Sequence, residues 1–367
     1  MNKVYLIEYQ GRCDENGIPV GHAPKVISEY YNFIKDYCDV TVLAPKTFSN
    51  VLSDSGVDNT VILPRHIVMK GQTPFIEKIT NKLGMFKNIK EAIKLADKDG
   101  DVNLWFFNVE YYIMLYFFLH KKPKHKVTLT MFIDGYHAGK NASIKNKIIN
   151  GIKQKVFESA QKKFDLIIST GEKFKYKNCK NEFIPDYYYI DEIYDKYNNV
   201  NKSDYAVCLG TMGRGKQLRE LVDTFNRIRY KLNISGRFYD KELFKELKAA
   251  ANENITINDT YLSNEEYLKL LSEAKYTVLP YPENCYSHQT SGVMQEAIFL
   301  KTIPVTYKSI LDGNCCPGVG FESWDKLTTD MLDNNEDIVD ELTKLIDTTF
   351  NRENVIAKYK MIFDCSK

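Results

Sequence analysis

The sequence has no apolar stretch long enough to span a bilayer. The longest, from Trp105 to Leu119, is interrupted by Asn108 and Glu110 and falls short of the roughly 20 residues that a membrane helix needs. The opening residues, as far as Glu8, have the pattern of a strand interrupted by charge rather than that of a signal peptide. We therefore expect a cytoplasmic protein, with a peripheral contact at the inner face of a membrane as the strongest membrane association.

Paired cysteine spacings are also missing. None of the eight cysteines belongs to a CxxC motif, and the adjacent Cys315 and Cys316 match no spaced zinc-ligand pattern. This favours reduced thiols in a reducing compartment over a metal or redox site.

The chain has little net charge, since 50 Lys and Arg stand against 48 Asp and Glu. The two halves differ, however: residues 1–190 carry 28 basic and 20 acidic side chains, and residues 191–367 carry 22 and 28. Lysines concentrate in 70–98, 121–126 and 140–163. They form either an ordinary solvated surface or a contact with anionic lipid or a polyanionic acceptor. Nucleic acid is not an expected partner, because no aromatic or arginine readout surface is interleaved with these lysines.

The chain is long enough and apolar enough to form two hydrophobic cores, since it has 367 residues, of which 44% are hydrophobic. In the first half, apolar runs of strand length alternate with helical patterns. The expected strands are 4–8, 39–44, 102–107, 127–132 and 165–169, and the expected helices are 25–36, 87–98, 110–120 and 144–162. This alternation predicts a parallel, doubly wound sheet.

A polar, aromatic stretch at 185–204 lacks periodicity and is the expected connection between domains. The alternation then restarts, with expected strands at 205–209, 232–235, 256–258, 276–279 and 303–306, and helices at 217–230, 240–252, 264–274, 291–300, 336–348 and 352–363. We therefore predict an α/β chain of two Rossmann-like, doubly wound domains that face each other across a cleft. The predicted domains are 1–190 and 200–350, and a C-terminal helix within 351–367 packs back toward the first.

The most informative segment, 274–305, reads as a buried strand, a polar loop and a helix. Thr290 or Ser291 can cap this helix, and Gly292 lets a ligand approach the backbone closely. The exposed N–H groups of a helix start favour an anion. If Glu296 faces the cleft, it can accept hydrogen bonds from vicinal hydroxyls such as those of a ribose. In the alternative interpretation, Ser-Gly merely caps a core helix whose Glu296 is solvated.

A second segment, 207–217, combines a strand, a glycine loop with the cations Arg214 and Lys216, and the start of a helix. Such a loop can hold a diphosphate through charge-assisted hydrogen bonds. The spacing from Gly210 to Lys216 approaches that of a P-loop. However, Gln217 stands where a P-loop needs a hydroxyl for Mg²⁺, and no apolar run ending in an acid follows as a second metal anchor.

Together the two segments resemble the donor domain of GT-B glycosyltransferases, most closely the retaining family-four group. Gly210 and Lys216 match the register of a glycine and a lysine in that family. Thr211 stands in place of the usual arginine, for which Arg214 is the candidate substitute. The resemblance implies that Gly210 belongs to the donor site, and that Arg214 and Lys216 bind the donor diphosphate and stabilise it as the leaving group.

The resemblance also implies which residues bind the other parts of the donor. It implies that the backbone at Ser291, Gly292 and Val293 cradles the distal phosphate, that Tyr261 and Leu262 meet the base, and that Glu296 holds the ribose. One position departs from the family pattern, because the glutamate expected eight residues before Glu296 is His288. Whether His288 or Glu283 replaces it stays open.

The first half resembles the same family more weakly. Gly21, in the glycine loop that begins at Gly17, falls where the family has a loop under the donor phosphates. His137 falls where the family has a histidine that contacts the transferred sugar, which makes it a candidate catalytic residue. His22 and His288 are acceptor-side candidates. Either His137 or His22 can also be an ordinary hydrogen-bonded loop histidine.

The resemblance thus implies transfer of a hexose-type sugar from a nucleotide sugar, with UDP-sugars favoured, to a glycan or lipid-linked acceptor in bacterial surface-glycan synthesis. Retention of configuration and independence of metals and other cofactors are expected. The Asp-x-Asp motif that a GT-A enzyme uses after a strand occurs here within 97–101, before one. Two alternatives are a GT-B-fold sugar-nucleotide epimerase and a non-catalytic nucleotide-sugar-binding protein.

Overall fold

The computed structural model describes residues 1–19, 23–69, 74–107, 109–137, 143–186, 191–283, 285–333 and 335–363. The chain divides into two compact units: unit 1 is Met1–Tyr188 with Arg352–Lys367, and unit 2 is Tyr189–Asn351. Each unit has its own parallel sheet and its own apolar core. The predicted class, α/β with two doubly wound sheets, is confirmed.

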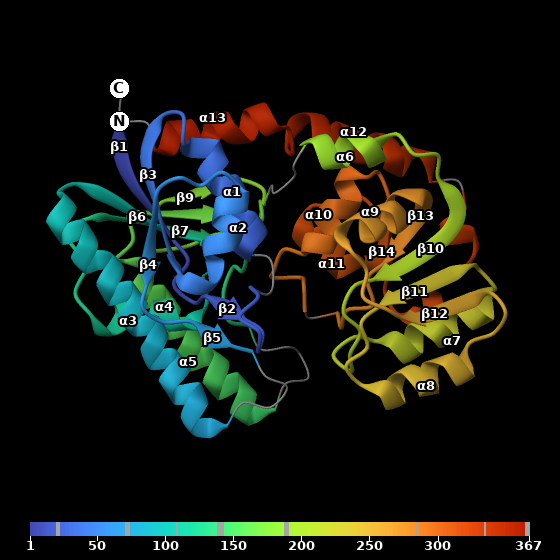
Figure 1. The fold of residues 1–367 in the computed structure, drawn as a ribbon. Coiled ribbons are helices and arrows are strands. Elements are labelled where there is room, and N and C mark those ends of the chain that lie inside the picture. The colour runs from blue at the N-terminus through green and yellow to red at the C-terminus, as the bar shows by residue number, and fades with distance from the viewer. Residues whose placement is uncertain are drawn as a thin grey trace. The chain divides into compact units, whose positions relative to one another are not determined.

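Unit 1 is built on parallel strands in the order β4-β3-β1-β6-β7-β8-β9 (Figure 1). These strands are β1 (Asn2–Ile7), β3 (Cys38–Pro45), β4 (Thr60–Leu63), β6 (Val102–Phe106), β7 (Lys126–Met131), β8 (Leu166–Ser169) and β9 (Asn181–Phe183), and the short β2 (Arg12–Cys13) and β5 (Ile67–Val68) pair separately. The helices are α1 (Ala23–Ile34), α2 (Ser49–Asp54), α3 (Phe75–Asp99), α4 (Tyr111–Leu119), α5 (Ile144–Gln161) and α13 (Arg352–Phe363). In the central strand β1, residues 4–7 form a continuous buried apolar run because helices cover both sheet faces.

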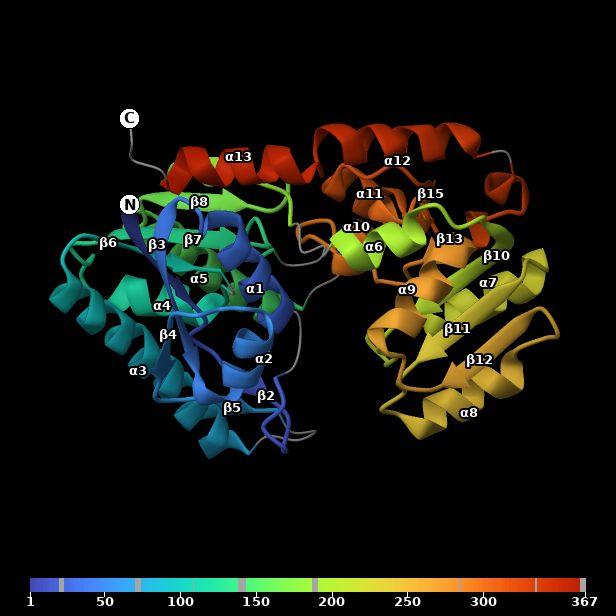
Figure 2. The same cartoon turned by 45° about the horizontal axis from the view of Figure 1, so that its top comes forward.

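The C-terminal helix α13 packs against α1 and the sheet of unit 1 (Figure 2). The ring of Tyr359 stacks on Phe33 with centroids 5.5 Å apart, and the ring of Phe363 lies 4.8 Å from that of Trp105. At the start of the helix, Arg352 lies 3.5 Å from the carboxylate of the buried Glu29. The last helix therefore completes the aromatic core of unit 1.

Unit 2 has parallel strands in the order β12-β11-β10-β13-β14-β15. The strands are β10 (Ser203–Leu209), β11 (Leu232–Gly236), β12 (Ile255–Asp259), β13 (Ala274–Val278), β14 (Ile303–Tyr307) and β15 (Val319–Phe321). The helices are α6 (Asp191–Asn198), α7 (Leu218–Ile228), α8 (Lys241–Ala250), α9 (Asn264–Glu273), α10 (Gly292–Phe299), α11 (Lys308–Asn314) and α12 (Glu336–Thr348). Helices α7 and α8 pack together, as do α6 and α9 (Figure 2).

The strand order of unit 2 reverses between β10 and β13. From β10 the chain moves outward to β11 and β12, and it then returns to β13 and continues to β14 and β15 on the other side. The loops that leave the carboxyl ends of β10 and β13 therefore run in opposite directions. In open α/β sheets, the crevice at such a switch point is the usual place for a ligand. Both segments that the sequence singles out begin at this switch point.

Four helices differ from the sequence-based expectation, since α2, α6 and α11 were not expected and α3 begins earlier. The stretch expected to be an irregular connection contains α6, whose Lys196 lies 2.5 Å from the carboxylate of Glu265 on α9. Helix α3 begins at Phe75 rather than at 87, and among its described side chains the first buried one is Met85. The apolar periodicity that predicts a core-facing helix starts only where this burial starts. None of the described helices is both long and apolar enough to cross a bilayer.

Lys202 lies at the C-terminal end of α10. Its Nζ donates hydrogen bonds to the carbonyl oxygen of Leu300 at 2.6 Å and to Oγ1 of Thr302 at 2.7 Å. Burial lowers the pKa of Lys202 from 10.5 to about 7, and the neighbouring charge of Lys301 contributes. The unfolded chain therefore binds a proton between pH 7 and pH 10.5 that the folded chain binds less well.

This proton makes stability depend on pH. Because the unfolded state holds more protons in that range, the free energy of unfolding should rise with pH, by roughly 2 kcal/mol between pH 7 and pH 9. We expect Lys202→Met to remove most of that rise. Urea unfolding of both proteins at the two pH values measures it, and an equal rise in both would contradict the assignment.

Candidate functional site

The loop after β10 is held by its backbone against the end of β11. Gly210 has φ +96°, a left-handed conformation that favours glycine. Its N–H donates to the carbonyl of Ser235 at 3.2 Å, and the N–H of Met212 donates to the carbonyl of Arg237 at 2.9 Å. A Cβ on Gly236 would lie 1.7 Å from the carbonyl oxygen of Gly210. Glycine at 236 is thus what lets the two backbones approach.

Lys216 lies at the end of this loop, beside the segment that follows β13. Its Nζ is 5.8 Å from the ring centroid of Tyr281, and the next N–H, of Gln217, donates to the carbonyl of Pro280 at 2.7 Å. Burial raises the pKa of Cys208 to about 11, and the positive charge of Lys216 partly opposes that rise. The ammonium therefore lies near the carboxyl end of β10, at the switch point.

The start of helix α10 lies beside the same tyrosine, which forms a hydrogen bond with the Ser291 side chain. Ser291 is the N-cap of this helix, and Ser291 Oγ accepts a hydrogen bond from the N–H of Met294 at 3.4 Å. Burial raises the pKa of Tyr281, against which a hydrogen bond with the Ser291 side chain acts, and the charge of Glu296 contributes to the rise. Glu296 is only 7% exposed, so the alternative of a solvated glutamate is wrong.

Lys216 and the start of α10 thus converge on Tyr281. An anion held there would meet one ammonium group and the first-turn N–H groups at Gly292 and Val293. A positive side chain and a helix N-terminus acting on the same place stabilise negative charge from two directions.

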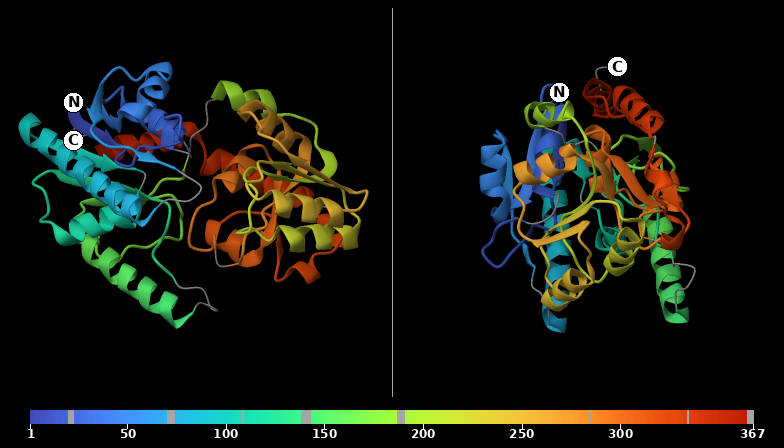
Figure 3. Two further views of the ribbon diagram at one scale, coloured as in Figure 1. Left: turned by 60° about the horizontal axis from the view of Figure 1, so that its bottom comes forward. Right: turned by 90° about the vertical axis from the view of Figure 1, so that its right-hand side faces the viewer.

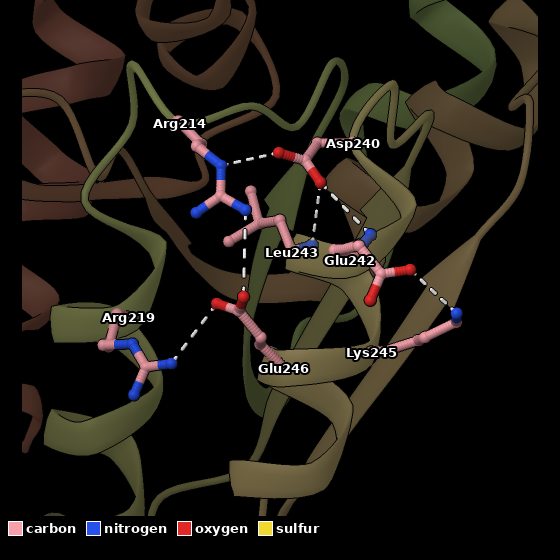
Figure 4. Close-up of polar contacts among 7 residues, drawn as sticks. All are labelled: Arg214, Arg219, Asp240, Glu242, Leu243, Lys245 and Glu246. Atoms are coloured by element: carbon pink, nitrogen blue, oxygen red, sulfur yellow. Dashed lines mark hydrogen bonds and ion pairs between the residues drawn. The ribbon is translucent and has the colours of Figure 1, made fainter.

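Arg214 has other partners, the N-cap residue of α8 and a glutamate within that helix (Figure 4). Its Nε donates to Oδ2 of Asp240 at 2.6 Å, and its Nη2 lies 3.8 Å from Oε1 of Glu246. The backbone N–H of Leu243 and then the Arg214 guanidinium hold the pKa of Asp240 below its usual value. The two cations that were expected to act together therefore have different surroundings. Lys216 lies at the switch point, beside Tyr281, whereas Arg214 pairs with two carboxylates.

This pairing leads to a prediction for Arg214→Gln. Because the guanidinium is exposed and already neutralised by two acids, we expect its loss to change the affinity for a nucleoside diphosphate by less than about threefold. Isothermal titration with UDP measures the change. If the affinity instead fell as far as in a Lys216 variant, Arg214 would have to leave Asp240 for the phosphates on binding.

A hollow of about 310 Å³ lies at the carboxyl ends of β10 and β11, lined by Gly210, Thr211, Gly236, Arg237, Tyr239, Tyr261, Leu262, Asn264 and Tyr267. Tyr261 is 73% exposed, and the Arg237 guanidinium lies 5.0 Å from the centroid of its ring. An exposed ring next to a planar cation offers a flat surface on which an aromatic base can stack.

The remaining predicted residues are spread over both units. His137 follows β7, and its Nε2 lies 2.8 Å from Oδ1 of Asp134, which fixes the orientation of the ring. His288 and Glu283 are both exposed in the loop between β13 and α10. Gly21 and His22 lie outside the described residues.

Tyr281 and Arg237 are among the members of this site that sequence reasoning missed. Tyr281 lies inside the segment that the sequence marks as informative, but nothing in its spacing shows that it contacts Lys216. Arg237 follows a strand directly after Gly236, and a glycine followed by a cation at a strand end is a signal that could have found it.

No family model and no curated protein matches the sequence. Solved structures match over nearly the whole chain. HepE of Anabaena, determined in complex with UDP, has a TM-score of 0.60 at 12% identity, with 99% of each chain covered. TarM has a TM-score of 0.65 at 11% identity, again with 99% of each chain covered. AviGT4, a glycosyltransferase involved in avilamycin A biosynthesis, has a TM-score of 0.53 at 12% identity, covering 99% of this chain and 97% of its own. Identities this low establish architecture rather than activity, and the architecture of this chain, two parallel-sheet α/β units, is the GT-B fold.

Proposed function

We propose that the chain is a glycosyltransferase that binds the diphosphate of a nucleotide sugar at the switch point of unit 2. The observation that carries this proposal is the convergence of Lys216 and the N-terminus of α10 on Tyr281. When the sugar leaves, negative charge develops on the diphosphate, and donors already aimed at that charge lower the barrier. Because Lys216 and the first N–H groups of α10 can stabilise this negative charge, we propose a reaction that is independent of metals and other cofactors.

We place the nucleoside of the donor between the phosphate site and the end of β11. The base lies in the hollow against Tyr261 and Leu262, beside Arg237, and the ribose hydroxyls bind the largely buried carboxylate of Glu296. The UDP bound to HepE, which shares this fold, favours a UDP-sugar as the donor. Gly210 has no side chain and so leaves room for the nucleotide beside the loop.

On the acceptor side the proposal follows the family resemblance. His137, oriented by Asp134, contacts the transferred hexose-type sugar, and the reaction retains the anomeric configuration. Gly21 belongs to the loop under the donor phosphates, and His22 is on the acceptor side. His288 or Glu283 takes the place of the glutamate that the family has eight residues before Glu296. The acceptor is a glycan or a lipid-linked saccharide, and the setting is bacterial surface-glycan synthesis in the cytoplasm.

A two-step experiment tests this function. The full chain is first screened by thermal shift against UDP-, GDP- and CMP-sugars, where a donor at about 100 times its Kd adds roughly 2.7 kcal/mol of stability. The stabilising donor is then incubated alone and with saccharide acceptors. We expect slow hydrolysis alone and transfer with an acceptor. Conversion to a new sugar nucleotide without an acceptor would indicate the epimerase, and binding without any turnover would indicate the non-catalytic protein.

A further inference from the structure

Exposed apolar side chains form a line on each of two helices of unit 1. On α3 the line is Ile76, Ile79 and Leu83, which are 75%, 41% and 62% exposed, and on α5 it is Ile144, Ile148 and Ile152, which are 79%, 58% and 57% exposed. We call these lines the α3 stripe and the α5 stripe. Single exposed apolar residues are ordinary, but three in helical register on one face are not.

Each stripe points away from the mean direction of the buried side chains of its helix, and on α5 the row of i+4 positions reaches the buried Val156 one turn after Ile152. At 3.6 residues per turn, the α5 stripe points roughly 130° away from the mean direction of the buried Val156, Phe157 and Ala160. The α3 stripe points roughly 140° away from the buried residues that begin at Met85. The stripes therefore face outward, and the described residues of unit 1 leave them exposed.

The helices are also longer than the sheet they cover. Helix α3 has 25 residues, or roughly 37 Å, whereas the six residues of β1 extend roughly 20 Å. Among the described side chains, burial begins only at Met85 in α3 and at Val156 in α5. The N-terminal halves thus extend past the sheet, and both views of Figure 3 show α3 and α5 extending on the same side of unit 1.

Lysines follow each stripe along the outward face. After the α3 stripe, this face carries the exposed Lys87, Lys90 and Lys94, and after the α5 stripe it carries the exposed Lys155 and Lys162. Between 144 and 157 the sequence has four lysines and no acidic residue. Each helix therefore presents apolar groups at its projecting end and positive charge roughly one to three turns behind them.

We propose that the projecting ends of α3 and α5 dock on an anionic membrane surface. The two stripes enter the boundary between headgroups and acyl chains, and the lysines behind them lie at the level of the lipid phosphates. A second copy of the chain is a poorer occupant, because a symmetric contact would place the same lysines against one another. Docking of this kind does not depend on the transferase activity, and it would bring unit 1 to lipid-linked acceptors.

Co-sedimentation of the full chain with lipid vesicles tests the proposal. The vesicles are phosphatidylcholine with or without phosphatidylglycerol, and binding is expected only with the anionic lipid and to weaken as salt is raised. The double variant Ile148→Ser with Ile152→Ser should weaken binding by more than about tenfold. The matched control is Leu119→Ser, which changes a side chain of similar exposure (61%) at the C-terminal end of α4 and should bind like the wild type.

The lysines are tested separately from the stripes. Lys87→Gln together with Lys155→Gln should reduce binding to anionic vesicles by roughly 25-fold, because one lysine near such a surface is worth about fivefold. Donor hydrolysis in solution should be unchanged in all these variants, which separates this proposal from the proposed function. Three results would overturn it: no binding of the wild type to anionic vesicles, full binding by the isoleucine double variant, or self-association that this variant abolishes.

Discussion

Replacing Lys216 by methionine should weaken UDP affinity by roughly 10- to 100-fold and reduce sugar transfer by at least as much. Methionine keeps most of the length of the lysine stem, so the packing near Tyr281 changes little, while the charge is lost. A charge-assisted hydrogen bond to a phosphate contributes about 1.5–3 kcal/mol, and a donor aimed at developing charge is worth roughly 100- to 1,000-fold in turnover. Isothermal titration with UDP and a donor-consumption assay measure the two effects.

The matched control for this variant is Lys245→Met. Lys245 is an exposed lysine of α8 that pairs with Glu242 at 2.9 Å, so its loss removes the same charge from the same unit away from the switch point. We expect wild-type UDP affinity from the control. Equal losses in the two variants would mean that only the net charge of unit 2 matters, and no loss in Lys216→Met would remove Lys216 from the site.

Gly236→Ala should have the largest effect on stability. The added Cβ would lie 1.7 Å from the carbonyl oxygen and 2.7 Å from the carbonyl carbon of Gly210, and neither backbone atom can move without opening the loop after β10. Steric overlap in packed protein costs about 1–3 kcal/mol and more where backbone must shift. We expect the unfolding of unit 2 to lose about 3 kcal/mol or more, measured by urea denaturation.

Gly213→Ala is the control, because it makes the same chemical change in the same loop. A Cβ on Gly213 meets no atom within 4 Å, so the variant should be as stable as the wild type or slightly more stable. If both variants lost the same stability, flexibility of the loop rather than the approach of Gly210 to Gly236 would explain the effect.

The fold was largely predictable from local patterns. The strands of a doubly wound sheet are buried on both faces, so β1, β6 and β14 appear as apolar runs that any window along the sequence detects. Likewise, Ser291 before Gly292 is a local signal for a helix start, and the structure has its N-cap there. The strand-and-helix alternation indicated the class, and the segments 207–217 and 274–305 indicated where the sheet of unit 2 could hold a ligand.

Features that depend on contacts between distant residues were not predictable in this way. The partners of Arg214 lie 26 and 32 positions further along the chain, and no spacing rule connects them to it. The contact between Lys216 and Tyr281 exists only because β10 and β13 are neighbours in the sheet. Helix α6 was missed because its sequence is polar, and the first part of α3 was missed because it contributes no buried side chain.

A crystal structure of the full chain with UDP tests the proposed site most directly. We predict the diphosphate within hydrogen-bonding distance of Lys216 Nζ and of the backbone N–H groups at Gly292 and Val293, with the uracil ring stacked on Tyr261. UDP bound at any other place, with its phosphates out of reach of both Lys216 and the start of α10, would contradict it.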